Sequence, residues 1–271
     1  MAAVPVPAGA PAEPVVEVLS ADKVYANGTR ALEPIELRVH AGEFVTLLGP
    51  SGCGKSTLLK MIASLIAPTD GRLLWWRQGF ERVGEPGRKL VMVFQDATLM
   101  PWARVQKNVR LPLDLAKTER TAADGRVRDA LALVGLTGFE RHFPRQLSGG
   151  MQMRTSIARA LVTDPNLLLM DEPFGALDEI TRNRLDADLI QLWWRKKLTV
   201  IFVTHSIYEA VFLSTRVVVM AARPGRVLRE IAIDEPHTRT DAFRVTQKFA
   251  QCARTLSELL AEAAASGATD P

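Results

Sequence analysis

The chain has 271 residues, of which 47% are hydrophobic and 24% charged, a composition typical of a globular protein with a sizeable core. The net charge is only +4, without a dense basic block, which argues against nucleic-acid binding. No apolar run approaches the roughly 18 residues of a membrane span. Cys53 and Cys252 have neither metal-site nor disulfide-framework spacing, which fits a reducing compartment. We therefore expect a soluble protein that reaches a membrane only through a partner.

Residues 1–14 are rich in Ala and Pro and carry no Lys or Arg, which indicates a disordered tail and not a signal peptide. Beyond them, short apolar runs alternate with longer amphipathic stretches. The apolar runs predict strands at Phe44–Leu48, Leu90–Phe94, Leu167–Met170, Thr199–Val203 and Arg216–Met220. The amphipathic stretches predict helices at Lys55–Ile66, Ala122–Val134, Gly149–Val162, Glu179–Lys196 and Asp241–Ala264. This alternation predicts an α/β fold with a mostly parallel sheet covered by helices on both faces.

The alternation divides the chain into regions. We predict a main domain over residues 15–240, interrupted by an inserted helical subdomain at about 96–155 that is punctuated by prolines and lacks clear strands. Residues 226–271 predict a strand, a C-terminal helix over 241–264 and a loose tail over 265–271. The pair Trp75-Trp76 lies in a segment that we assign to a β-subdomain, where surface packing explains it better than nucleotide contact.

The strongest motif is GPSGCGKST at 49–57, which follows a predicted strand and opens a predicted helix. It fits the phosphate-binding pattern G-x-x-x-x-G-K-[ST]. The glycines let successive N–H groups point at phosphates, and the helix start adds partial positive charge. Lys55 is expected to reach the β- and γ-phosphates, and the Ser56 hydroxyl to bind Mg²⁺. The predicted nucleotide-binding residues of this motif are Gly49, Pro50, Ser51, Gly52, Cys53, Gly54, Lys55, Ser56 and Thr57.

LLLMDEP at 167–173 is a predicted buried strand that ends in two carboxylates. A carboxylate pair at a strand end is by itself often an exposed loop or a helix cap. Beside a phosphate loop, Asp171 can hold Mg²⁺ through water, and Glu172 can polarise the attacking water as a general base.

A third motif, LSGGMQMR at 147–154, indicates which class of phosphate-loop protein this is. Ser148 occupies a helix-cap position, and Gly149 and Gly150 expose the backbone at the start of a predicted helix, which makes a second anion site. The segment resembles the signature sequence of ABC ATPases. That resemblance implies a P-loop NTPase core with an antiparallel β-subdomain, and a head-to-tail dimer in which each signature closes over the ATP of the other protomer.

Four further residues match ABC landmarks in the family's order, although each alone is an ordinary residue. Tyr25 resembles the aromatic that stacks on adenine, and Gln95 resembles the glutamine that joins Mg²⁺ and the attacking water to the transmembrane interface. Asp178 resembles the residue that crosses the dimer interface, and His205 the histidine that contacts the γ-phosphate. The resemblance covers about residues 16–225 and implies catalytic roles for Lys55, Gln95, Glu172 and His205.

The segments at 97–109, 151–154 and 179–193 resemble importer ATPases of the nitrate/sulfonate/taurine type. Such bacterial subunits work at the cytoplasmic face of the inner membrane with a separate permease and a periplasmic or extracellular solute-binding protein. Met100, Pro101 and Trp102 occupy the place where a permease would dock, or else form a turn around a buried Trp. The alternatives left open are the ATPase of a separate-permease exporter and a non-transport ABC ATPase.

Overall fold

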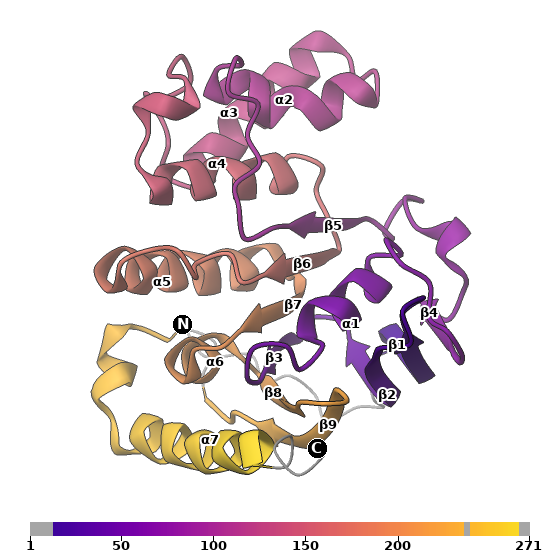
Figure 1. Cartoon of the computed structure of the whole chain (residues 1–271). Helices are drawn as coiled ribbons and strands as arrows, with labels where there is room; N and C mark the ends of the chain where they lie inside the picture. Colours follow the sequence, from indigo (N-terminus) through magenta and orange to yellow (C-terminus); the bar gives the residue numbers. More distant parts are fainter. Residues whose placement is uncertain (1–12, 236–238, 266–271) are drawn as a thin grey trace.

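The computed structural model describes residues 13–235 and 239–265 (Figure 1). Its main sheet has the strand order β5-β6-β7-β3-β8-β9. The first five strands in that order are parallel, and β9 is antiparallel to β8. The bounds are β3 Phe44–Leu48, β5 Leu90–Val93, β6 Leu167–Asp171, β7 Thr199–Thr204, β8 Arg216–Ala221 and β9 Arg226–Ala232. The predicted α/β fold with a mostly parallel sheet is confirmed.

A second, antiparallel sheet packs beside the first, in the strand order β2-β1-β4. Its strands are β1 Pro14–Val24, β2 Arg30–His40 and β4 Arg72–Trp75. Pro14 is buried and pairs with His40, so the predicted tail over 1–14 extended too far. A proline is tolerated at the first position of a strand because it need not donate there. Residues 1–12 of that predicted tail lie outside the described residues.

Trp75 belongs to the core and not to the surface, contrary to the sequence-based interpretation. It is only 6% exposed, and its Nε1 donates to the Ile62 carbonyl at 2.9 Å. Its ring also meets Phe80 edge to face, with centroids 4.9 Å apart. Trp75 therefore fixes the antiparallel sheet to the C-terminal end of α1, Lys55–Ile62. This helix ends four residues earlier than predicted, and Ser64 beyond it has a positive φ of 55°.

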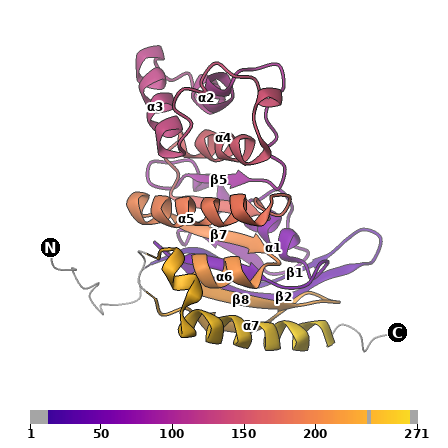
Figure 2. The ribbon, with the colours of Figure 1, turned by 90° about the vertical axis from the view of Figure 1, so that its left-hand side faces the viewer.

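The parallel strands are buried on both faces, which explains their continuous apolar sequences. One face packs on α1 and the antiparallel sheet, through residues such as Leu47 and Leu58. The other packs on helices α5 Glu179–Lys196, α6 Ile207–Leu213 and α7 Gln247–Ala265, through residues such as Phe44 and Phe202. Figure 2 shows these three helices layered over that face.

A helical region projects from the edge of the sheet at β5, as Figures 1 and 2 show. It contains α2 Val105–Leu115, α3 Arg120–Leu133, a 3₁₀ turn Pro144–Gln146 and α4 Gly149–Leu161. Between β5 and β6 the described chain forms no strand. The helix α2 was not predicted, because Pro112 lies inside it and its N-terminus has no side-chain cap.

The C-terminal segment is not the single helix that was predicted over 241–264. It forms a 3₁₀ turn, Asp241–Val245, and then α7. Thr246 separates the two, with an extended backbone and a hydroxyl that accepts from the Phe249 amide at 3.2 Å. This threonine acts as a helix cap, which an apolar periodicity does not reveal. Of the predicted tail over 265–271, Ala265 ends α7 and residues 266–271 lie outside the described range. Within the described residues, no helix has the length and apolar character needed to cross a bilayer.

Candidate nucleotide site

The loop between β3 and α1 adopts a conformation that requires glycine at several positions. Gly52 and Gly54 have φ values of 78° and 88°, which side chains rarely allow. A Cβ atom on Gly49 would lie 2.6 Å from both the Cys53 sulfur and the Met220 carbonyl oxygen. The loop therefore wraps tightly around the start of α1, where backbone N–H groups can donate hydrogen bonds to phosphate oxygens.

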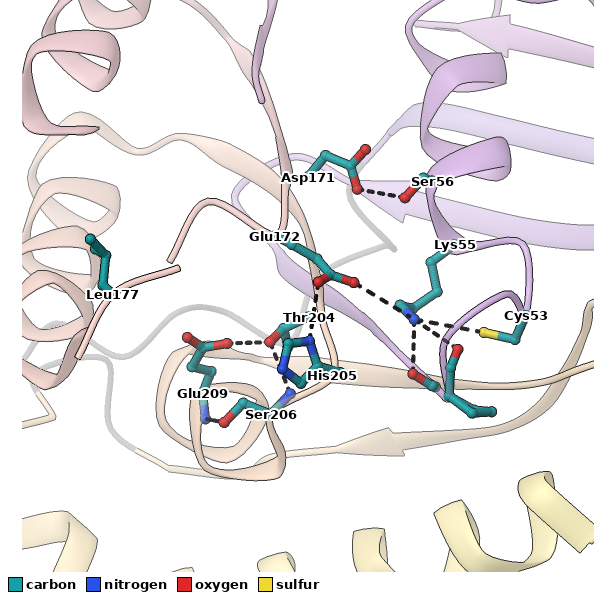
Figure 3. A network of polar contacts seen from close by, with 12 residues as sticks. Cys53, Lys55, Ser56, Asp171, Glu172, Leu177, Thr204, His205, Ser206 and Glu209 are labelled. Carbon is teal, nitrogen blue, oxygen red and sulfur yellow. Dashed lines mark hydrogen bonds and ion pairs between the residues drawn. The ribbon is translucent and has the colours of Figure 1, made fainter. Parts of the chain in front are cut away.

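Lys55, the first residue of α1, lies back across this loop. Its side chain is only 4% exposed, and Nζ donates to the Gly49 carbonyl at 2.8 Å and to the Pro50 carbonyl at 3.0 Å (Figure 3). The same ammonium is 3.9 Å from Oε1 of Glu172. A buried cation is thus held beside the phosphate loop by neutral carbonyls and one carboxylate.

Ser56 and Asp171 form a pair of hard oxygen donors. The Ser56 hydroxyl donates to Oδ1 of Asp171 at 2.8 Å, which joins the first turn of α1 to the end of β6. Burial raises the pKa of Asp171, and the bond from Ser56 opposes that rise. A hydroxyl and a carboxylate at this spacing match the ligand preference of Mg²⁺, so the donor set fits this ion.

Glu172 lies between a cation and an imidazole. Its backbone has a φ of 46°, and its amide donates to the Val203 carbonyl at 3.0 Å, which turns the side chain toward the end of β7. There Oε2 is 3.1 Å from Nδ1 of His205. A carboxylate that contacts both Lys55 and an exposed imidazole can accept a proton from a water molecule bound between them.

Gln95 follows β5, the neighbour of β6, and its amide reaches the same area. A Cβ atom built on Gly175 would lie 3.7 Å from Nε2 of Gln95 and 3.8 Å from Oε2 of Glu172. The side chains of Gln95 and Glu172 therefore both lie next to Gly175. Gln95 also lies in the segment that connects β5 to the helical region.

Ser148, Gly149 and Gly150 begin α4. The Ser148 hydroxyl accepts from the Met151 amide at 3.4 Å. A Cβ atom on Gly150 would lie 2.7 Å from Cγ2 of Thr181, so the starts of α4 and α5 pack closely. Among the described residues, no hydrogen bond or ion pair joins Ser148 to the 49–57 loop.

Asp178 is exposed and caps α5 by accepting from the Thr181 amide at 2.9 Å. This bond lowers the pKa of the Asp178 carboxyl. The starts of α4 and α5, capped by Ser148 and Asp178, therefore pack against each other through Gly150 and Thr181.

Tyr25 and Cys53 border the loop in different ways. Tyr25 is 40% exposed, its hydroxyl is 3.3 Å from Oγ1 of Thr57, and the Lys23 ammonium lies over its ring, 5.7 Å from the centroid. Cys53 is fully buried, and its sulfur faces the core beside Gly49. Its sulfur is also 3.9 Å from the Lys55 ammonium, so of this residue only the backbone can meet a phosphate. Ser51 is exposed at the tip of the loop.

The family model described as "ABC transporter" matches residues 32–175, which is more than half of the chain. The chain belongs to the ABC transporter family. Its relatives include an uncharacterised ABC transporter ATP-binding protein of Methanocaldococcus jannaschii, 50% identical over 79% of this chain and 80% of that protein. Another is the aliphatic sulfonates import ATP-binding protein SsuB of Bacillus cereus, 43% identical over 86% of this chain and 92% of that protein.

Solved structures agree with this assignment. A dimeric bacterial ABC transporter cassette is 33% identical, with a TM-score of 0.71 over 82% of this chain and all of that one. The cbiO1 subunit of the cbiONQ complex of Clostridium perfringens is 26% identical, with a TM-score of 0.75 over 90% of this chain and 99% of that one. The chain is thus an ATP-binding subunit of an ABC transporter and an ATPase, and its P-loop NTPase fold with an antiparallel β-subdomain is confirmed.

Two exposed aromatic positions mark the helical side of this ABC ATPase. Phe94 is 39% exposed next to Gln95, and Trp102 is 77% exposed. Asn108 is buried and bonds the Met100 amide at 2.7 Å and the Ala103 carbonyl at 3.0 Å, which fixes the turn that presents Trp102. The alternative of a turn around a buried Trp is therefore wrong.

Three residues next to the loop that carries His205 were not predicted from the sequence: Thr204, Glu209 and Arg182. Glu209 is 4% exposed and accepts from the Thr204 hydroxyl. Its amide donates to Ser206 Oγ at 3.4 Å. The spacing of Ser206 and Glu209 is that of a helix capping box, which was the available signal.

Proposed function

We propose that this chain hydrolyses ATP to drive a small-solute importer through a separate permease. The observation that carries this proposal is the position of the Glu172 carboxylate, 3.9 Å from the Lys55 ammonium and 3.1 Å from the His205 imidazole. A carboxylate held between these groups at the edge of a phosphate loop suits the activation of water beside a γ-phosphate.

The phosphate loop of residues 49–57 binds the triphosphate through its N–H groups, with Lys55 at the β- and γ-phosphates. Tyr25 stacks on the adenine. Ser56 and Asp171, with Gln95 nearby, would hold Mg²⁺, which supplies charge stabilisation for the phosphates when it is bound. Glu172 takes the proton of the attacking water, and His205 orients Glu172 and the γ-phosphate.

A second copy of the chain completes the site. Ser148, Gly149 and Gly150 cap a helix N-terminus that has no hydrogen bond to its own phosphate loop among the described residues. In a head-to-tail dimer this helix start would meet the γ-phosphate of the partner, with Asp178 at the contact. The similarity to a cassette of known dimeric structure supports this arrangement.

Movement of the helical region would pass to the permease through Gln95 and Trp102. The likeness to an aliphatic sulfonate import subunit supports uptake, in the nitrate/sulfonate/taurine class, with a periplasmic or extracellular binding protein upstream. The chain would then act at the cytoplasmic face of a bacterial inner membrane. The ATPase subunit does not contact the solute, so its chemical identity depends on the other chains.

Reconstitution with its permease partner in proteoliposomes tests the proposal. For an importer, we expect the solute to accumulate in the compartment that contains this subunit and ATP. Trp102→Glu should abolish that accumulation. The isolated Trp102→Glu subunit should bind ATP like the wild type. Val245→Glu, at an equally exposed apolar residue of the C-terminal segment, is the control. Transport in the outward direction, or loss of ATP binding by Trp102→Glu, would contradict the proposal.

A further inference from the structure

The loop that carries His205 borders an open space next to the start of α6. A cavity of about 450 Å³ lies there, lined by residues of α5, α6 and the C-terminal segment. The His205 side chain is 54% exposed. Because a catalytic side chain must hold its position without a surrounding core, other contacts have to fix this loop.

Hydrogen bonds inside the loop supply the first part of that support. The Thr204 hydroxyl accepts from the Ser206 amide at 3.0 Å and donates to the Glu209 carboxylate (Figure 3). Ser206 Oγ accepts from the Glu209 amide at 3.4 Å. The residues on both sides of His205 are thus bonded to Glu209 of α6, Thr204 to its buried carboxylate and Ser206 to its backbone amide.

Arg182 of α5 extends this support to a second loop. Its Nε is 3.6 Å from Oε1 of Glu209, and its Nη2 donates to the Leu177 carbonyl at 2.9 Å. Leu177 directly precedes Asp178, the residue proposed above to lie at the dimer contact. One arginine therefore connects the histidine loop with the Leu177–Asp178 loop.

We propose that Glu209 and Arg182 are positioning residues that hold His205 in register with the Leu177–Asp178 loop. The inference rests on the proposed roles of His205 and Asp178. In the intact arrangement the two loops move as one body, so a partner that contacts Asp178 also fixes the histidine. A misplacement of about 1 Å in a catalytic group can lower a rate on the order of 10²-fold, so the effect is measurable.

Thr204 offers a matched pair of variants. Thr204→Val keeps the shape of the side chain but removes the hydroxyl, while Thr204→Ser keeps the hydroxyl. We expect Thr204→Val to lower kcat by about tenfold or more, and Thr204→Ser to stay near the wild type. ATP affinity should be unchanged in both. Equal activity of both variants and the wild type would overturn the proposal.

Arg182→Met tests the connection to the second loop, with Arg184→Met on the exposed side of the same helix as its control. Arg182→Met should lower kcat and leave ATP affinity unchanged, whereas Arg184→Met should change neither. If Arg182→Met and Arg184→Met behave alike, Arg182 does not position the site.

A double variant distinguishes an effect that acts through His205 from a general loss of structure. If these residues act through His205, Thr204→Val should cause no further loss of single-turnover rate in a His205→Ala background. An additive loss there would overturn the proposal, because the effect would not pass through the histidine.

A readout without nucleotide completes the test. The sequence has four histidines, so His205→Ala assigns the His205 imidazole signal in NMR spectra. Thr204→Val should broaden or shift this signal and Thr204→Ser should not; an identical signal in both would contradict the proposal. If the wild-type protein hydrolysed no ATP, the proposed function would fail, while the imidazole signal would still report whether the loop is held.

Discussion

Nδ1 of His205 lies 3.1 Å from Oε2 of Glu172, although 32 residues separate them in the chain. The contact arises because β6 and β7 are neighbouring parallel strands whose carboxyl ends lie at one edge of the sheet. The backbone bond from the Glu172 amide to the Val203 carbonyl sets this register. The strand pairing therefore brings the proposed base and its orienting group to one edge of the sheet, and the contacts of Glu209 and Arg182 then hold the loop beyond β7.

Replacement of Glu172 by Gln tests the base. The amide keeps the shape of the side chain but cannot accept the proton of water. ATP should still bind, and hydrolysis should fall by at least about 10²-fold, the loss typical of a missing general base. Turnover and nucleotide affinity are measured together, with Glu179→Gln on the surface of α5 as control. Near-normal turnover would remove Glu172 from this role.

Replacement of Ser148 by Arg tests whether the start of α4 serves the partner and not its own chain. In a Glu172→Gln background, ATP should accumulate a dimer that is visible by light scattering. Adding Ser148→Arg should abolish this dimer, because a long side chain blocks the approach to the partner's phosphate. Each monomer should keep its ATP, since Lys55 and Asp171 are unchanged.

The comparison for this experiment is Lys55→Ala, which should weaken nucleotide binding and dimerisation together. The decisive quantity is the nucleotide affinity of dilute, monomeric Ser148→Arg protein. If it falls as far as that of Lys55→Ala, the signature helix acts within its own chain and the dimer hypothesis is wrong.

Cys53 should be protected from thiol reagents by burial and not by the nucleotide. Burial raises the pKa of its thiol, although Lys55 opposes the rise, so little thiolate forms at neutral pH. In the native protein, iodoacetamide should modify the half-buried Cys252 well before Cys53, with or without MgATP. Mass spectrometry of the two peptides measures this order, and rapid labelling of Cys53 that MgATP prevents would contradict the structure.

Asp186 should make the stability of the protein depend on pH. Burial raises the pKa of Asp186 to about 7, and Glu209 adds to the rise, while Arg244 and Arg182 oppose it. Because the pKa in the folded state exceeds the ordinary value of 3.8, the stabilisation is complete below pH 3.8 and is lost as the pH rises through about 7. Asp186→Asn removes this titration.

We therefore expect the melting temperature of Asp186→Asn, relative to the wild type, to increase between pH 4 and pH 8. A constant difference between Asp186→Asn and the wild type over this range would show that Asp186 does not titrate as proposed.

The sequence predicted those elements whose signals are local. The bounds of β3 and α5 agree with the structure residue for residue, because β3 is a bounded apolar run and α5 begins at the Asp178 cap and ends at the left-handed Lys197. The strand ends that carry Asp171 and His205 followed from the same pattern. The helix α2 was missed because a proline such as Pro112 argues against a helix, and the break at Thr246 because a local capping bond leaves no mark in an apolar periodicity.

Side-chain directions in the loops could not be predicted. The motif places Cys53 among the phosphate-binding residues, but the backbone angles of Gly52 and Gly54 turn its sulfur into the core. Likewise, the position of Arg182 under the histidine loop depends on how α5 packs against α6. These relationships connect residues that are distant in sequence, and no spacing pattern records them.

The strand order has a consequence for biosynthesis. Strand β3, which carries the phosphate loop, is bonded on its two sides to β7 and β8, and both are synthesised after most of the chain. During translation, the apolar strand β3 and its glycine loop therefore have no sheet partners until β7 and β8 are made. The helical region is synthesised in the meantime and can fold on local contacts. Pairing of such distant segments is slow, and unpaired strand edges invite aggregation. A nascent chain of this kind gains its ATP site only near the end of synthesis, and chaperones that cover β3 until then should raise its yield.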